Sequence, residues 1–117
     1  MNIEELRDFC LSLKGAGEKM PFDDKFLVFT VKDKMFCLTN LEEYDYINLK
    51  CDPEKAILLR EEFEEVTPGY HMNKKHWNSV ATKGNISISQ MKEWIVDSYN
   101  LVVKGLPKKL QKELLEE

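Results

Sequence analysis

The feature that most constrains the fold is a pair of short segments rich in β-branched and aromatic residues. Residues 26–31 (FLVFTV) and 35–39 (MFCLT) flank the polar run Lys32-Asp33-Lys34. Such residue types fit the pleated surface of a strand, and a polar run of this length suits a tight hairpin connection. The pattern therefore predicts an antiparallel β-hairpin over residues 26–39.

A third strand is predicted over residues 44–50, where apolar and polar side chains alternate. Ile47 and Leu49 share one face, which we expect to pack against the core. The other face is expected to carry Tyr44, Tyr46, Asn48 and Lys50. This division of side chains is typical of an antiparallel sheet with one face packed on the core and the other partly exposed to solvent. On this face, Tyr46 could stack on the bases of a single nucleic-acid strand while Lys50 binds its phosphates. The alternative is that these side chains only form ordinary cross-strand pairs.

Helices are predicted on both sides of this meander from capping residues and from apolar side chains at helical spacing. Asn2 and Ser87 are each followed three residues later by Glu5 and Gln90, as in a capping box. A second helix is expected to begin at Asp52-Pro53, and a last short one at Pro107. Two more extended segments are predicted over residues 66–70 and 76–82. The class is therefore α+β with an antiparallel sheet, and 1–117 form a single domain.

The composition limits the setting in which this domain works. No apolar run approaches the roughly 20 residues that span a bilayer, and the acidic start of the chain lacks the apolar segment of a secretory signal. Three widely spaced cysteines without a C-x-x-C pair fit a reducing environment. We therefore expect a cytoplasmic protein with no membrane partner, present as a monomer or weak dimer.

The most individual stretch of the chain is Pro68–Val80 (PGYHMNKKHWNSV). It holds both histidines, one of the two tryptophans and an adjacent lysine pair, with no acidic residue. Because the net charge of the chain is -4, binding to an anion must be local rather than driven by bulk charge. Lys74, Lys75 and nearby Lys83 supply positive charge, and Tyr70 and Trp77 supply flat faces for stacking. The alternative is that the aromatic side chains pack inward and the lysines only solubilise a sheet edge.

Catalysis and metal binding have little support in the sequence. His71 and His76 are five residues apart, with no third Cys, Asp or His at zinc spacing. A Cys–His pair would require Cys37 or Cys51 to meet a histidine in space, and no glycine elbow supports one. No phosphate-binding glycine loop is present. We therefore predict no catalytic residue, no metal site and no cofactor, so the chain is not expected to be an enzyme.

The run Pro68–Val80 is similar to the signature of the MmcQ/YjbR family. Similar segments fall where that family places them, at Lys19–Phe22, Lys34–Phe36, Ile47–Pro53, Ser98-Tyr99 and Leu106-Pro107. The resemblance covers nearly the whole chain. It implies a two-layer α-β-β-β-α-β-β-α fold in which helices pack one face of an antiparallel sheet. Members are commonly labelled DNA-binding, through a likeness to the "double wing" surface of the phage transcription factor MotA.

Carried over residue by residue, the resemblance implies a nucleic-acid contact surface on a basic, aromatic hairpin wing. Its members are Tyr70, His71, Asn73, Lys74, Lys75, His76, Trp77 and Asn78, with Lys34 on the first hairpin and Lys50 on the third strand as additions. DNA is the expected partner, contacted at phosphates and bases. The alternative function is a protein-interaction adaptor without a nucleic-acid or catalytic role.

Overall fold

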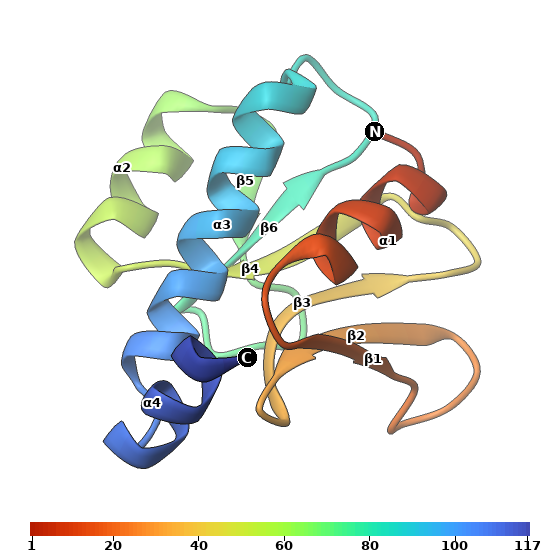
Figure 1. Cartoon of the computed structure of the whole chain (residues 1–117). Helices are drawn as coiled ribbons and strands as arrows, with labels where there is room; N and C mark the ends of the chain where they lie inside the picture. The colour runs from red at the N-terminus through yellow and green to blue at the C-terminus, as the bar shows by residue number, and fades with distance from the viewer.

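The computed structural model describes all 117 residues and contains one six-stranded antiparallel sheet with four helices (Figure 1). The predicted α+β class is confirmed. The helices are α1 (Ile3–Ser12), α2 (Pro53–Glu62), α3 (Ile88–Lys104) and α4 (Lys108–Glu116). The strands are β1 (Ala16–Lys19), β2 (Phe26–Val31), β3 (Lys34–Asn40), β4 (Tyr46–Lys50), β5 (Val66–Pro68) and β6 (Trp77–Ala81).

The strands lie in the order β1-β2-β3-β4-β6-β5, and each pairs antiparallel with its neighbours. Lys32 and Asp33 alone form the turn between β2 and β3, with φ angles of 48° and 64°. Two positive φ angles characterise the tight turn that matches the twist of a hairpin. Lys34, expected in the turn, pairs instead with Val31 as the first residue of β3.

Strand β1 is an element that the sequence did not indicate. Its four residues, Ala-Gly-Glu-Lys, have low β-propensity. They are extended because their backbone pairs with the edge of β2, from Ala16 opposite Val31 to Lys19 opposite Val28. Arg7 on α1 also donates two hydrogen bonds to the Glu18 carboxylate, over 2.8 and 2.7 Å. Tertiary pairing, rather than local preference, therefore makes this strand.

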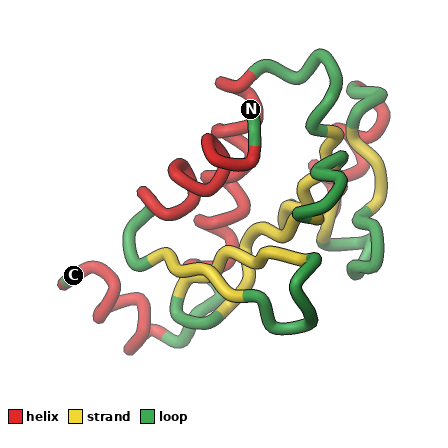
Figure 2. The backbone as a smooth tube through the Cα atoms, turned by 90° about the vertical axis from the view of Figure 1, so that its right-hand side faces the viewer, coloured by secondary structure: helices red, strands yellow, loops and turns green.

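One face of the sheet carries the core, and α1 and α3 lie together on that side (Figures 1 and 2). Ile47 and Leu49 on β4 point toward the helices, as the alternation predicted. The ring of Phe36 on β3 meets Tyr99 on α3 edge to face, with centroids 5.5 Å apart. Ser98 donates to the carbonyl of Phe36 over 2.6 Å and thereby ties α3 to the sheet. The helix-covered face therefore has mainly a structural role.

The helix starts follow the predicted capping residues. Asn2 and Glu5 form the complete capping box, with reciprocal bonds of 2.8 and 3.1 Å. At α3 only half of the predicted box forms. Ser87 accepts from the Gln90 amide, but the Gln90 side chain donates to Glu93 over 2.7 Å instead of returning to Ser87. None of the helices is long and apolar enough to cross a membrane.

Tyr44 departs from the predicted alternation. Strand β4 begins only at Tyr46, and Tyr44 lies in the preceding turn with a φ of 46°. Its side chain packs against the core, and its hydroxyl donates to the carbonyl of Met1 over 3.0 Å. The prediction that Tyr44 shares the open face with Tyr46 is therefore wrong, because the positive φ of Tyr44 interrupts the alternation of side chains before β4 begins.

Candidate binding surface

The predicted wing is a loop of eight residues, 69–76, that joins β5 to β6; we call it the wing loop. Arg60 on α2 holds its C-terminal part. Its Nε donates to Oδ1 of Asn78 over 2.7 Å, and its Nη2 donates to the carbonyls of Lys74 and Trp77. Hydrogen bonds from a charged donor are among the stronger ones in proteins. The loop is therefore tied to a helix rather than free in solvent.

A buried polar network holds the other end of the wing loop against the open face of the sheet, the face without helices. Asn48 is fully buried, and its Nδ2 donates to the carbonyl of Tyr70 over 3.0 Å. The Tyr70 amide donates to Oγ of Ser79 over 2.9 Å, and the Ser79 hydroxyl donates to Oδ1 of Asn48. Because buried polar groups must be paired, these three residues fix where the loop lies on the sheet.

Four of the predicted lysines lie near one end of the sheet, which we call the lysine end. Lys34 begins β3, Lys50 ends β4, and the wing loop with Lys74 and Lys75 leads directly into β6. The register places Lys50 opposite Trp77 on the neighbouring strand. None of these four lysines forms an ion pair. Nζ of Lys74 instead donates to the carbonyl of Gly69 over 3.0 Å, which holds this side chain against the wing loop.

The aromatic members of the predicted surface differ in exposure. Tyr70 is 56% exposed, and its ring meets Tyr46 edge to face at 5.7 Å and lies 4.0 Å from the His71 ring. His71 is exposed, whereas His76 and Trp77 are only partly so. Burial, followed by the nearby charge of Asp45, raises the pKa of the Tyr46 phenol. The inward-packing alternative therefore describes Trp77 better than Tyr70.

The two predicted asparagines have separate roles. Asn73 is exposed, and its Oδ1 accepts the Lys75 amide over 2.9 Å, which shapes the tip of the wing loop. Asn78 is 2% exposed and points toward α2, where Nδ2 donates to the carbonyl of Ala56 over 3.3 Å. Its Oδ1 is taken by Arg60. This position removes Asn78 from any exposed contact surface and makes it an anchor of the loop.

Lys83 does not join the other lysines. It follows β6 at the opposite end of the sheet from Trp77. The adjacent turn lies against an acidic side chain, because the Asn85 amide donates to Oε2 of Glu65 over 2.9 Å. A continuous positive strip from Lys74 through Lys75 to Lys83 therefore does not form, since the length of β6 separates them.

A groove on the open face of the sheet was not foreseen from the sequence. It has a volume of about 270 Å³, and Tyr46, Tyr70 and His71 also line an adjoining, more polar hollow of about 540 Å³. The apolar lining of the groove comes from Phe22, Phe26, Leu38, Tyr46, Tyr70 and Met72. Phe22, in the connector between β1 and β2, is 68% exposed at the groove, and Tyr70 is 56% exposed beside it. Exposed apolar side chains that adjoin one another often mark a binding site.

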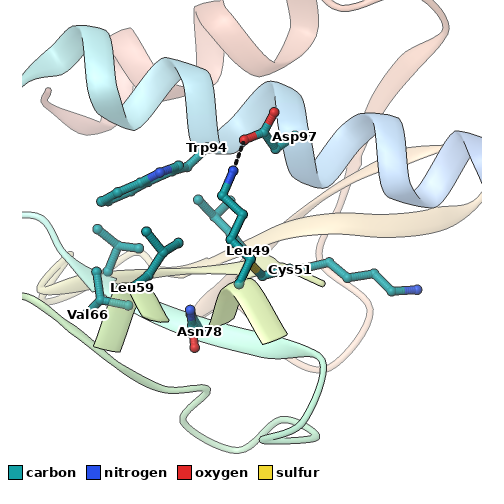
Figure 3. A pocket seen from close by; sticks show the side chains of 10 residues that line it. Leu49, Cys51, Leu59, Val66, Asn78, Trp94 and Asp97 are labelled. Atoms are coloured by element: carbon teal, nitrogen blue, oxygen red, sulfur yellow. Dashed lines mark hydrogen bonds and ion pairs between the residues drawn. The ribbon is translucent and has the colours of Figure 1, made fainter. Parts of the chain in front are cut away.

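A second, smaller hollow lies on the helix side of the sheet between α2 and α3 (Figure 3). It measures about 20 Å³, which is room for a water molecule at most. Lys55 pairs with Asp97 over 3.1 Å at its edge. Cys51 lines it, and burial raises the pKa of this thiol. A raised pKa disfavours the thiolate that a nucleophile requires.

No histidine side chain is hydrogen-bonded to a cysteine. The Cys51 amide donates to the carbonyl of His76 over 2.8 Å, so the two residues are neighbours through their backbones. No hydrogen bond joins either imidazole to a thiol or a carboxylate. Cys10 and Cys37 are fully buried, as expected of small apolar side chains. No group of three or more His, Cys, Asp or Glu side chains is arranged to hold a metal ion.

Comparison with known proteins gives consistent relatives. The YjbR family model matches residues 11–101. The protein YbdF of Escherichia coli O157:H7, described as uncharacterized, is 45% identical over 95% of this chain and 92% of its own length. The protein YjbR of Escherichia coli K12, also described as uncharacterized, is 33% identical over 99% of both chains.

Solved structures with a similar fold come from related proteins. The crystal structure of the Deinococcus radiodurans protein DR2400, a DUF419 domain, is similar with a TM-score of 0.90 and 38% identity, over 97% of this chain and 87% of that one. A crystal structure of a Pseudomonas syringae protein has a TM-score of 0.73 and 26% identity, over 86% of this chain and 98% of that one. On the sequence motif, the family match and the shared fold, this chain belongs to the YjbR family.

Proposed function

We propose that this chain is a small cytoplasmic nucleic-acid-binding module that contacts DNA through the lysines at one end of its sheet and through the wing loop. The observation that carries the proposal is the convergence of Lys34, Lys50 and Lys75 near that end without an ion-pair partner. Side chains from three separate parts of the chain thus present positive charge together, as phosphate contacts require.

The distribution of acidic residues supports a local anion site in a chain of net charge -4. Glu42, Glu43 and Asp45 lie between β3 and β4, at the end of the sheet opposite the lysines. The acidic segment 61–65 lies at that same opposite end, because β5 follows it with Val66 paired to Val80. Acidic residues also lie near the lysines: Asp33 and Glu117 are paired with Lys19 and Lys32, whereas Asp52 and Glu54 begin α2 just after Lys50. The charge is therefore only partly separated, and this partial separation orients an approaching polyanion toward the lysine end.

An aromatic side chain among the lysines favours a single strand over a duplex. Trp77 is partly exposed and lies opposite Lys50 on the neighbouring strand, and stacking of bases on aromatic side chains does not depend strongly on sequence. We further propose that the chain acts by binding and not by catalysis. The two imidazoles are bonded to no thiol or carboxylate that could make either one part of a catalytic pair.

The test is a titration of a fluorescent single-stranded 12-mer and of its duplex at about 50 and about 200 mM salt, read by anisotropy. Binding is expected to be weak, to favour the single strand and to decrease with salt. The double variant K74A/K75A should reduce the log–log salt slope by about 0.7 for each phosphate that the variant no longer binds. Absence of binding at about 50 mM salt would contradict the proposal, because the electrostatic contribution is strongest there.

A protein-interaction adaptor is the second candidate function, and one observation favours it. Phe22, Tyr70 and Met20 are all exposed, and two of them line the groove on the open face. Exposed apolar side chains around a groove are typical of protein-binding surfaces. A peptide that binds at the groove, together with no effect of K74A/K75A on any ligand, would favour this second function.

A further inference from the structure

We propose that the groove on the open face of the sheet binds an arginine side chain from a basic peptide segment of a protein partner. This site is distinct from the lysine end assigned to nucleic acid above and does not depend on that proposal. It lies at the opposite part of the open face, between the β1–β2 connector and the first residues of the wing loop.

The walls of the groove are aromatic. Tyr46 and Tyr70 meet edge to face at 5.7 Å, and Phe22 and Phe26 line the same groove. Aromatic rings carry negative charge on their faces and attract a cation placed over them. Since the guanidinium group is planar, it can stack on such a ring while its N–H groups point to acceptors at the edge.

The rim supplies those acceptors. Asp23 lines the groove, and Glu43 and Asp45 line the polar hollow that adjoins it through Tyr46 and Tyr70. All three carboxylates are exposed and none forms an ion pair. Burial raises the pKa of the Tyr46 phenol, and the charges of Asp45 and Glu43 raise it further, so both carboxylates act on this ring. A phosphate would be repelled here, whereas a guanidinium would gain ion pairs.

The shape of the site points to a peptide rather than to a free small cation. The groove is open to solvent, and Phe22 remains 68% exposed at its edge, with Met20 44% exposed close by in the chain. A small cation would leave these apolar side chains in water. A peptide with apolar residues on either side of the arginine would cover them, as the exposed apolar surface of a protein-binding site requires.

The buried network beneath the groove keeps it formed before a ligand arrives. Asn48 and Ser79 bind the backbone of Tyr70 from below and thereby position the Tyr70 ring. A preformed site loses less conformational entropy on binding. Weak but specific binding is therefore expected even from a short peptide.

The experiment is an NMR titration of the ¹⁵N-labelled full chain with the capped peptide acetyl-Leu-Arg-Leu-amide. Matched peptides carry Lys, Gln or Glu in the central position. The Arg peptide is expected to shift the amide resonances of Tyr46, Tyr70 and His71 and to bind more tightly than the Lys peptide. The Gln and Glu peptides should produce no saturable shift. Equal binding of the Gln peptide would overturn the proposal, because the groove would then recognise only the leucines.

Variants locate the site without affecting the fold. The double variant E43Q/D45N should bind the Arg peptide at least about fivefold more weakly, because two exposed ion pairs are removed. F22S, at an exposed position, should also weaken it. The control E61Q/E62Q removes the same charge from α2, far from the groove, and should leave binding unchanged. An equal loss in this control would overturn the proposal by making the attraction nonspecific. K74A/K75A should not alter peptide binding, which separates this test from that of nucleic-acid binding.

Discussion

The guanidinium of Arg60 on α2 donates from Nε to Oδ1 of Asn78 on β6 over 2.7 Å. The same side chain also donates to two carbonyls of the wing-loop region, those of Lys74 and Trp77. Arg60 thus connects an acidic helix to the basic loop, and it does so through hydrogen bonds to neutral acceptors rather than through an ion pair. The position of the loop therefore depends on a helix that precedes it in the chain.

We expect Arg60→Ala to destabilise the protein by about 1.5–3 kcal/mol, because hydrogen bonds to a charged donor are removed and Asn78 is left buried without a partner for Oδ1. Urea denaturation followed by circular dichroism measures the change. Arg7→Ala is the control, since the exposed Arg7–Glu18 pair should contribute much less. Equal losses for both variants would contradict an anchoring role for Arg60.

Gly69→Ala should destabilise the start of the wing loop. A methyl group on Gly69 would lie 2.8 Å from Cβ of Trp77 and 2.9 Å from its carbonyl oxygen, so the backbone of β6 would have to move. We expect a loss of about 1–3 kcal/mol in the free energy of unfolding, as for other overpacked sites. At Gly17 the nearest atom, Oγ1 of Thr30, lies 3.7 Å away, and Gly17→Ala should be neutral or slightly stabilising. Thermal unfolding of the two variants gives the comparison.

Alkaline pH should weaken the folded state through Tyr44. Burial raises the pKa of its phenol above the unfolded value, and the neutral hydroxyl donates to the carbonyl of Met1. The contribution of Tyr44 is therefore complete below about pH 10, the usual tyrosine pKa, and is lost as pH rises from there toward the folded pKa, because only the unfolded chain ionises readily.

The measurement for Tyr44 is the urea midpoint of the wild type and of Tyr44→Phe at pH 8 and pH 10.5. Phenylalanine has no hydroxyl group, so it can neither donate the hydrogen bond to Met1 nor ionise. The wild type should be the more stable at pH 8, and its advantage should shrink at pH 10.5. A constant difference between the two proteins would exclude Tyr44 as a source of alkaline sensitivity.

Lys34 and Lys50 should contribute to nucleic-acid binding although neither belongs to the wing loop. In Lys34→Gln and Lys50→Gln, the log–log salt slope for a single strand should decrease by about 0.7 each. Lys83→Gln is the matched control, because Lys83 lies at the opposite end of the sheet. If all three variants changed the slope equally, the nucleic acid would contact lysines across the whole surface and not the lysine end in particular.

The sequence determined the elements of this protein wherever local chemistry is strong. Apolar spacing and capping residues predicted the starts of α1 and α3, and Asp52-Pro53 and Pro107 predicted those of α2 and α4. The β-branched run Phe26–Val31 predicted β2 with its observed bounds. The long motif Pro68–Val80 identified the family. Strand β1 could not be predicted, because its residues are extended only through pairing with the edge of β2.

The candidate site was predicted in its residue types more than in its arrangement. Tyr70, His71 and Lys75 are exposed on the wing loop as expected, whereas Asn78 is buried and Lys83 lies apart. The groove could not be predicted, since its lining comes from the β1–β2 connector, three strands and the wing loop. Periodicity sorts side chains onto faces within one element, but only tertiary packing decides which faces and ends meet. That packing set the lysine end and the groove apart on one small domain.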